Sequence, residues 1–401
     1  MTSALQINLG DRNIGTLTML PSGSVFFAFT QDYLNDPKRP VLSQSFISES
    51  GELIPESKAT RIQLPPFFSN LLPEGHMREY LANRGDVKPT NEFKLIELLG
   101  VDLPGAVTVS PVGEAAGHHE HEEPALSNEP PFHFSLAGVQ LKFSAIAEKH
   151  GGLTIPVSGT GGDWIIKLPA QNYANVPENE FAIMHLAGII GIPVPEIKLV
   201  SLADIGGLPE MGVLIGSQAL AIKRFDRAKG GKRIHIEDFA QVYSIYPHAK
   251  YENANYGNLA RMIWTLTGEE GLVDFIRRLA FTIITGNGDM HLKNWSFIYE
   301  DGITPKLSPA YDMVSTIPYI PKDGLALNLG DSKAMQSITL EHFKKLAKKA
   351  ALPDHLILQT VRDTVQATLA AWESNYKQYE LLAEILERIQ QHMREIALRH
   401  V

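Results

Sequence analysis

The chain of 401 residues contains no cysteine. This absence excludes a disulfide framework, a thiolate metal site and a cysteine nucleophile. No apolar stretch reaches the length that a bilayer span needs, and the start, MTSALQINLGDRNIG, has no basic segment followed by an apolar run. We therefore expect a cytoplasmic protein without a membrane partner.

Long blocks of lysine and arginine are also missing, and the formal net charge of -9 is spread along the chain. Binding to a nucleic-acid duplex depends on cations that neutralise several phosphates, so this chain alone should bind DNA poorly. An acidic enzyme can still bind ATP, because a few placed cations and a divalent metal handle the triphosphate locally.

The pattern of apolar residues changes from β-rich to helical along the chain. Residues 5–29 alternate between apolar and polar and predict short antiparallel strands, whereas the chain from Phe239 onward has helical spacing. Further elements are expected as helices within 61–83, at 91–99, 178–191, 275–285, 361–372 and 381–398, and as strands at 140–147, 163–168, 194–200 and 212–224. This order predicts an α+β, two-lobed protein-kinase-like fold with a small β-rich N-terminal subdomain and a mainly helical C-terminal lobe.

The expected divisions are an N-terminal subdomain at 1–112, a linker or surface loop at 113–131, the rest of the first lobe at 132–224 and the helical lobe at 225–401. The linker is rich in charge and proline. Its residues His118, His119 and His121 could bind a metal together with the neighbouring glutamates. The lack of anything nearby that would hold them rigid favours a solvated loop.

The most informative stretch is ITGNGDMHLKNWSF at 284–297, where Asn294 follows Asp289 by five positions. Protein kinases use this D-x-x-x-x-N spacing, because the Asp accepts the proton of the attacking hydroxyl while the Asn holds a metal beside the phosphate. The spacing alone occurs by coincidence in many proteins. Here an apolar helix precedes it, and Asp312 follows a short apolar run, where kinases place the second metal ligand. Asp312-Met313-Val314 replaces the usual Asp-Phe-Gly.

Upstream, the segment WIIK ends in Lys167 and resembles the kinase strand whose lysine pairs with the phosphates. Glu180, or Glu178 on the same expected helix, could be its ionic partner, although a surface lysine and a solvated glutamate are the plain alternatives. No G-x-G-x-x-G loop precedes Lys167, and SGTGG at 158–162 has the wrong spacing. The alternative segment for holding phosphates is FSLAGVQLKF at 134–143, which has a small-residue turn beside Gln140 and Lys142.

Together these motifs resemble the HipA kinase toxins of bacterial type II toxin-antitoxin systems, over nearly the whole chain. The motifs that carry the resemblance are LPPFFSNLLPEG (64–75), SLAGVQLKFS, IIKLP, AIKRFDR (221–227), IHIEDFAQ (234–241), GNGDMHLKN and LSPAYDMVS.

The resemblance implies a serine/threonine kinase that uses ATP and Mg²⁺, with Asp289 as the catalytic base and Ser135 as an autophosphorylation site whose modification ejects the phosphate loop and silences the kinase. It implies metal contacts at Asn294 and Asp312. The nucleotide contacts that it implies are Ala137, Gly138, Val139, Gln140, Leu141, Lys142, Lys167, Lys223, Arg224, Phe225, His291, Leu292, Lys293, Asn294, Tyr311 and Asp312.

Two residues depart from the family pattern. Lys223 stands in the hinge where an acid is common, but backbone groups make the adenine contact, so nucleotide binding should survive. Leu141 replaces a frequent acid in the phosphate loop.

For partners, the resemblance implies a helix-turn-helix antitoxin of the HipB kind that carries the DNA-binding charge this chain lacks. The toxin would then contact DNA only through the antitoxin and would act as a corepressor. It also implies a protein substrate, such as one of the aminoacyl-tRNA synthetases, which include glutamyl-tRNA synthetase.

Two other functions are open. A small-molecule kinase of the aminoglycoside-phosphotransferase kind uses the same arrangement of Asp and Asn in its catalytic loop. The N-terminal β-rich unit and the SLAGVQ segment disfavour this function. A degenerate, purely scaffolding kinase is disfavoured by intact Asp289 and Asp312.

Overall fold

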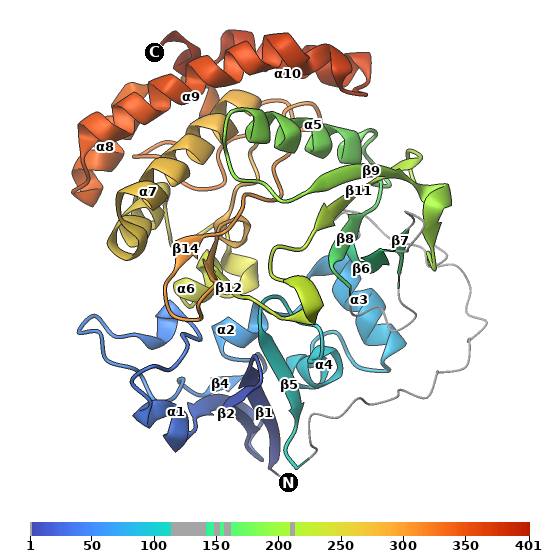
Figure 1. The fold of residues 1–401 in the computed structure, drawn as a ribbon, viewed down its shortest axis with the longest axis vertical. Helices are drawn as coiled ribbons and strands as arrows, with labels where there is room; N and C mark the ends of the chain where they lie inside the picture. Colours follow the sequence, from blue (N-terminus) through green and yellow to red (C-terminus); the bar gives the residue numbers. More distant parts are fainter. Residues whose placement is uncertain (1, 114–141, 148–152, 156–161, 209–212) are drawn as a thin grey trace.

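The computed structural model describes residues 2–113, 142–147, 153–155, 162–208 and 213–401. Figure 1 shows the N-terminal domain (residues 2–113) at one end of the molecule and the helices of the C-terminus at the other, with two further sheets between them. None of the helices in the described part is long and apolar enough to cross a bilayer. The linker with its histidines, the segment 134–141 and the glycine-rich segment 158–161 lie outside the described residues.

The N-terminal domain is built on a five-stranded antiparallel sheet in the order β4-β3-β2-β1-β5. Alternate residues of these strands, such as Leu5, Ile7 and Leu17, are buried, because side chains of a strand point to opposite faces. Four helices cover the buried face and share its core. The elements are β1 Ser3–Leu9, β2 Arg12–Met19, β3 Ser24–Phe29, β4 Thr60–Arg61, β5 Val107–Pro111, α1 Gln31–Asn35, α2 Pro66–Ser69, α3 Gly75–Arg84 and α4 Glu92–Leu99.

The N-lobe (described residues of 142–223) carries a six-stranded sheet in the order β10-β7-β6-β8-β11-β9. All its strand pairs are antiparallel except β10 with β7. Helix α5 packs against β11 and β9 on one side and contacts α9 on the other, which joins the two lobes. The elements are β6 Lys142–Ala147, β7 Leu153–Thr154, β8 Trp164–Lys167, α5 Val176–Ile189, β9 Ile197–Ser201, β10 Ile205–Gly206 and β11 Gln218–Lys223.

The C-lobe (residues 225–401) combines a small antiparallel sheet, β12-β13-β14, with a layer of helices. In Figure 1, α8, α9 and α10 form the outer layer and α7 lies beneath α9. Helix α7 contributes most of its second half to the largest buried cluster. The elements are β12 His235–Asp238, α6 Phe239–Val242, α7 Tyr256–Thr285, β13 Ser296–Tyr299, β14 Lys306–Leu307, α8 Leu340–Ala350, α9 Asp354–Asn375 and α10 Ala383–Glu395.

This architecture confirms the predicted two-lobed α+β fold, with local differences from the expected boundaries. The strand expected at 194–200 begins only at Ile197, because Pro193 and Pro195 have no N-H to donate to a ladder. The strand expected at 212–224 is confined to β11, Gln218–Lys223. The helix expected at 275–285 is the second half of α7, whose helical geometry is broken at Gly268.

Candidate active site

The loop that carries Asp289 begins where α7 ends. Gly286 closes the helix in the left-handed conformation, with φ +74°, which glycine adopts without steric cost. Its carbonyl accepts a hydrogen bond from the Thr316 N-H at 2.8 Å. At Gly288 a Cβ would lie 2.1 Å from Asp323 Oδ2, so only glycine permits this close approach. The GNGD sequence thus turns the chain sharply and binds it to the segment around Thr316.

Asp289 is partly buried and held on several sides. Its N-H donates to Asn287 Oδ1 at 2.9 Å, and its Oδ1 accepts a hydrogen bond from the Tyr251 hydroxyl at 2.5 Å. Burial raises the pKa of the Asp289 carboxyl above its ordinary value, although the Tyr251 hydrogen bond and the Lys250 charge oppose the rise. A carboxylate with a raised pKa in a fixed geometry suits a general base.

Asn294 lies at the end of a single 3-10 turn, Leu292–Asn294, and folds back onto Asp289. Its Nδ2 donates to the Asp289 carbonyl at 2.8 Å, which leaves its Oδ1 as an acceptor. His291 and Leu292 of the same loop are buried. Burial lowers the pKa of the His291 imidazole to about 3, so this histidine is neutral at ordinary pH. Any nucleotide contact of Leu292 would come from its backbone.

Asp312 lies beside this loop and faces two lysines. Its backbone occupies the left-handed region, with φ 55°, where a non-glycine residue is uncommon and often functional. Oδ2 accepts a hydrogen bond from Lys142 Nζ at 2.8 Å, and Oδ1 pairs with Lys167 Nζ. Burial alone would raise the pKa of the Asp312 carboxyl, but the two lysines outweigh burial and hold it well below the ordinary value.

Lys167 lies at the end of β8 and is almost fully buried. Its ammonium forms ion pairs with Glu180 of α5 and with Asp312. The structure therefore selects Glu180, and not Glu178, as the partner on the helix. Burial would lower the pKa of Lys167, yet the two carboxylates raise it to about 12. Four segments thus converge: β6 with Lys142, β8 with Lys167, α5 with Glu180 and the Asp312 turn.

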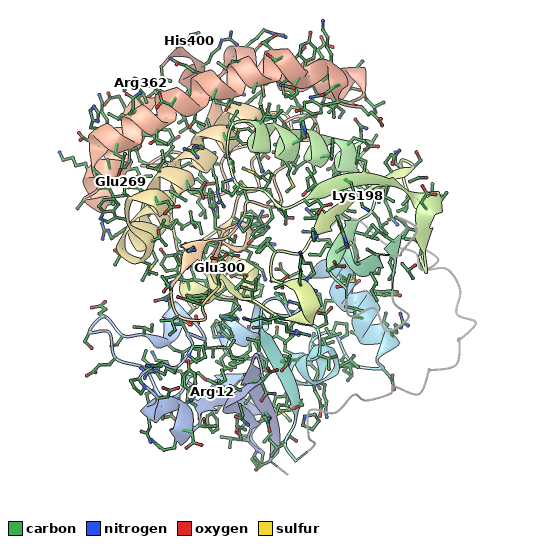
Figure 2. The ribbon with its side chains drawn as sticks, in the orientation of Figure 1. Arg12, Lys198, Glu269, Glu300, Arg362 and His400 are labelled. Carbon is green, nitrogen blue, oxygen red and sulfur yellow. The ribbon has the colours of Figure 1, made fainter. Side chains whose placement is uncertain are left out.

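The hinge between the lobes follows β11. The N-H groups of Lys223 and Arg224 donate to the carbonyls of Glu196 and Asp163, at 2.8 and 2.7 Å. The Lys223 side chain is half exposed, near Glu196 and the Trp164 ring. Lys198, labelled on β9 in Figure 2, places its Nζ 4.7 Å from the centre of that ring.

The Arg224 side chain points into a buried charged cluster and not into the space between the lobes. Its guanidinium contacts Asp226 at 2.8 Å and Asp102 of the N-terminal domain at 3.2 Å. A nucleotide contact at Arg224 would therefore come from its backbone. Phe225 next to it packs on Tyr311, with ring centres 5.7 Å apart, and the Tyr311 hydroxyl donates to the Lys293 carbonyl at 2.9 Å. The hinge, the catalytic loop and the Asp312 segment are joined in this way.

Ser135 and the expected phosphate-loop residues at 137–141 lie outside the described residues, so only Lys142 of that loop is placed. Residues that the sequence did not single out also touch the site, and they include Tyr251, Lys250 and Glu74. No short-range spacing links Tyr251 to Asp289, 38 positions away. Glu74 lies in the LPPFFSNLLPEG motif, which offered the only sequence signal for it.

The oxygen donors of Asn294 and Asp312 fit a magnesium ion. Within the described residues, no group of three or more His, Cys, Asp or Glu side chains could hold a metal by itself. Mg²⁺ does not need such a group, because it is commonly bound by one or two protein ligands together with substrate phosphates and water. Oxygen donors beside two phosphate-competent lysines match that requirement.

Two family models match the chain. The HipA N-terminal domain matches residues 5–110 and the HipA-like C-terminal domain matches residues 134–372.

Relatives and solved structures agree with these matches. The protein Y4dM of Sinorhizobium fredii is 49% identical over 396 residues, covering 97% of this chain and 96% of the relative. The serine/threonine-protein kinase toxin HipA of Shewanella oneidensis is 26% identical over 401 residues, covering 90% and 86%. A solved Shewanella oneidensis complex of HipA, HipB and operator DNA contains a chain with a TM-score of 0.76 and 22% identity, covering 99% of both chains.

Proposed function

The chain belongs to the HipA family, and we propose that it is an ATP- and magnesium-dependent serine/threonine protein kinase that acts as the toxin of a toxin-antitoxin pair. The observation that carries the proposal is the convergence of Lys167, Asp312 and the Asp289 loop. Lys167 pairs with Glu180, which is the lysine–glutamate ion pair that an active kinase needs, and the same ammonium also reaches Asp312.

In this proposal each residue has one task. Lys142 and Lys167 place positive charge where the phosphates would lie. In the structure both lysines form ion pairs with Asp312. Asn294 and Asp312 would supply oxygen atoms to the metal. Bound ATP and Mg²⁺ supply the transferable phosphoryl group and neutralise its charge. Asp289 orients the acceptor hydroxyl and takes its proton as the new oxygen–phosphorus bond forms and the bond between the γ-phosphorus and the departing ADP breaks.

The acceptor is proposed to be a serine or threonine of a protein, with Ser135 of the chain itself as one acceptor. Support comes from the 26% identical Shewanella oneidensis relative, which is named a serine/threonine-protein kinase toxin. An aminoacyl-tRNA synthetase remains our candidate for the external substrate, on the resemblance alone.

The proposed partner is a small helix-turn-helix antitoxin of the HipB kind. The similar Shewanella oneidensis chain was solved with HipB and operator DNA. The net charge of -9 supports an indirect route to DNA, because the cations that contact phosphates would come from the antitoxin. Corepression with that antitoxin is part of the proposal.

The test is transfer of label from γ-labelled ATP to the purified full-length chain with magnesium. We expect label on Ser135 in the wild type and a loss of at least about 100-fold in Asp289→Asn, because removal of a catalytic base costs about that much. The variant should melt within about 3 °C of the wild type, since Asp289 lies in a loop outside the packed core. If the wild type binds nucleotide but transfers no label, the kinase function is rejected and the scaffolding function is favoured.

A further inference from the structure

The Asp289 carboxylate is held by a residue outside the catalytic loop. Tyr251 follows the 3-10 turn Pro247–Ala249 and donates its hydroxyl to Asp289 Oδ1 at 2.5 Å. Its ring meets the His291 ring edge-on, with centres 5.0 Å apart, so the phenol is braced against the same loop that it contacts. A carboxylate has two oxygens, and a phenol that fixes one of them leaves the other, Oδ2, for the acceptor hydroxyl.

The segment that carries Tyr251 is held in turn by the N-terminal domain. Lys250 pairs through Nζ with Glu74 Oε2 at 2.9 Å, while its carbonyl accepts a hydrogen bond from the Leu292 N-H at 3.2 Å. The other oxygen of Glu74, Oε1, lies 3.0 Å from Lys293 Nζ. One carboxylate thus holds both the segment before α7 and the catalytic loop after it.

Local helix stability does not explain a glutamate at position 74. Glu74 is the residue before α3, where Ser, Thr, Asp or Asn would cap the helix better, and its side chain makes no capping hydrogen bond. Burial would raise the pKa of the Glu74 carboxyl, but Lys293 and Lys250 outweigh it and lower the pKa to about 2. The carboxylate is therefore charged wherever the enzyme would work.

We propose that Tyr251 is a positioning residue for the Asp289 carboxylate, and that Glu74 of the N-terminal domain fixes the segment that carries Tyr251. The inference rests on the proposed kinase function, because it concerns the base of that reaction. It assigns the N-terminal domain a positioning part in catalysis, because that domain holds the segment and the loop on which Tyr251 and Asp289 lie. Asn70 of the same domain adds to this contact, since its carbonyl accepts a hydrogen bond from Lys293 Nζ at 3.0 Å.

The test compares initial rates of label transfer from ATP to the full-length chain over a range of ATP concentrations. Tyr251→Phe removes one hydroxyl from a partly exposed side chain and should leave the fold intact. Its maximal rate should fall about tenfold, while the ATP concentration for half-maximal rate changes by less than about twofold, because only the geometry of the base is disturbed. Glu74→Gln should lower the maximal rate about threefold to tenfold in the same pattern.

The double variant tests whether both residues act through Asp289. Glu74→Gln/Tyr251→Phe should be no more than about twofold slower than Tyr251→Phe, since coupled residues are not additive. Gln44→Ala is the matched control. It removes another polar contact between the N-terminal domain and the C-lobe, the hydrogen bond from Gln44 Nε2 to the Tyr299 hydroxyl at 3.0 Å, away from the catalytic loop. It should label at the wild-type rate.

Each outcome either supports or overturns the inference. A wild-type maximal rate in Tyr251→Phe overturns it. A Glu74→Gln variant in which only the ATP concentration for half-maximal rate rises also overturns it. Equal slowing by Gln44→Ala and Glu74→Gln would mean that the contact merely joins two domains. If Glu74→Gln does not fold, Lys250→Met replaces it, because it breaks the ion pair between Glu74 and the Tyr251 segment. Lys250→Met also removes a positive charge near Asp289, so its rate is compared with that of the wild type over a range of pH. A wild type that transfers no label refutes the kinase function and this inference together, whereas normal transfer by Tyr251→Phe refutes the inference alone.

Discussion

Replacement of Lys167 by methionine gives the sharpest test of the charged centre. Methionine preserves most of the side-chain volume but removes the cation between Glu180 and Asp312. The Lys167 and Glu180 side chains are 4% and 2% exposed, so the Glu180 carboxylate would remain buried without its partner. Breaking a buried ion pair in this way costs about 3–5 kcal/mol, because the remaining charge has lost its solvent and its counterion. Asp312 suffers less, since Lys142 still pairs with it.

The free energy of unfolding, measured by urea denaturation at pH 7, should fall by that amount in Lys167→Met. The loss should shrink as the pH is lowered toward about 5, because proton uptake by the buried Glu180 carboxyl removes the unpaired charge. Lys167→Met/Glu180→Leu should return to within about 1 kcal/mol of the wild type, since an apolar pair of similar volume is often as stable as a buried ion pair. The double variant should be stable and inactive.

Comparison of these variants can refute the reasoning. If the double variant is as unstable as Lys167→Met, the loss comes from packing and not from an unpaired carboxylate. If Lys167→Met is as stable as the wild type, Lys167 is not committed to the pair, and the assignment of a phosphate-binding lysine to this position loses its structural basis.

Two other predictions concern the fold around the site. Burial lowers the pKa of His235 to about 4, from an ordinary value of 6.5, while its Nε2 lies 2.7 Å from the Leu42 carbonyl. The unfolded chain binds the proton more readily, so His235 should contribute up to about 3 kcal/mol to the decline in stability between pH 6.5 and 4, in addition to the share of His291. His235→Gln should remove the His235 share from pH-dependent melting curves. A methyl group at Gly288 would lie 2.1 Å from Asp323 Oδ2, so Gly288→Ala should cost about 1–3 kcal/mol and slow label transfer, whereas Gly188→Ala, whose nearest contact is 3.2 Å, should cost less than about 1 kcal/mol. A Gly288→Ala variant with normal stability and transfer would show that the loop relaxes freely.

Much of the candidate site could be predicted because it depends on local spacing. Asp289 and Asn294 share one loop, so the five-residue interval alone places the amide beside the base, and the structure has that contact at 2.8 Å. The choice between Glu178 and Glu180 needed coordinates, because both lie on α5 and only the rotation of the helix decides which one faces Lys167. Tyr251 carried no sequence signal, since nothing in the period of a helix or strand ties it to a loop 38 residues later.

The sequence by itself determined the kinds of element, their order and the chemistry available in each, because alternation, helical spacing and glycine positions act over a few residues. Tertiary structure alone decided which charged groups meet: Lys167 and Asp312 lie 145 positions apart, and Glu74 reaches Lys293 from another domain. Such pairs depend on how sheets and helices pack across the whole chain. No short interval in the sequence records that packing.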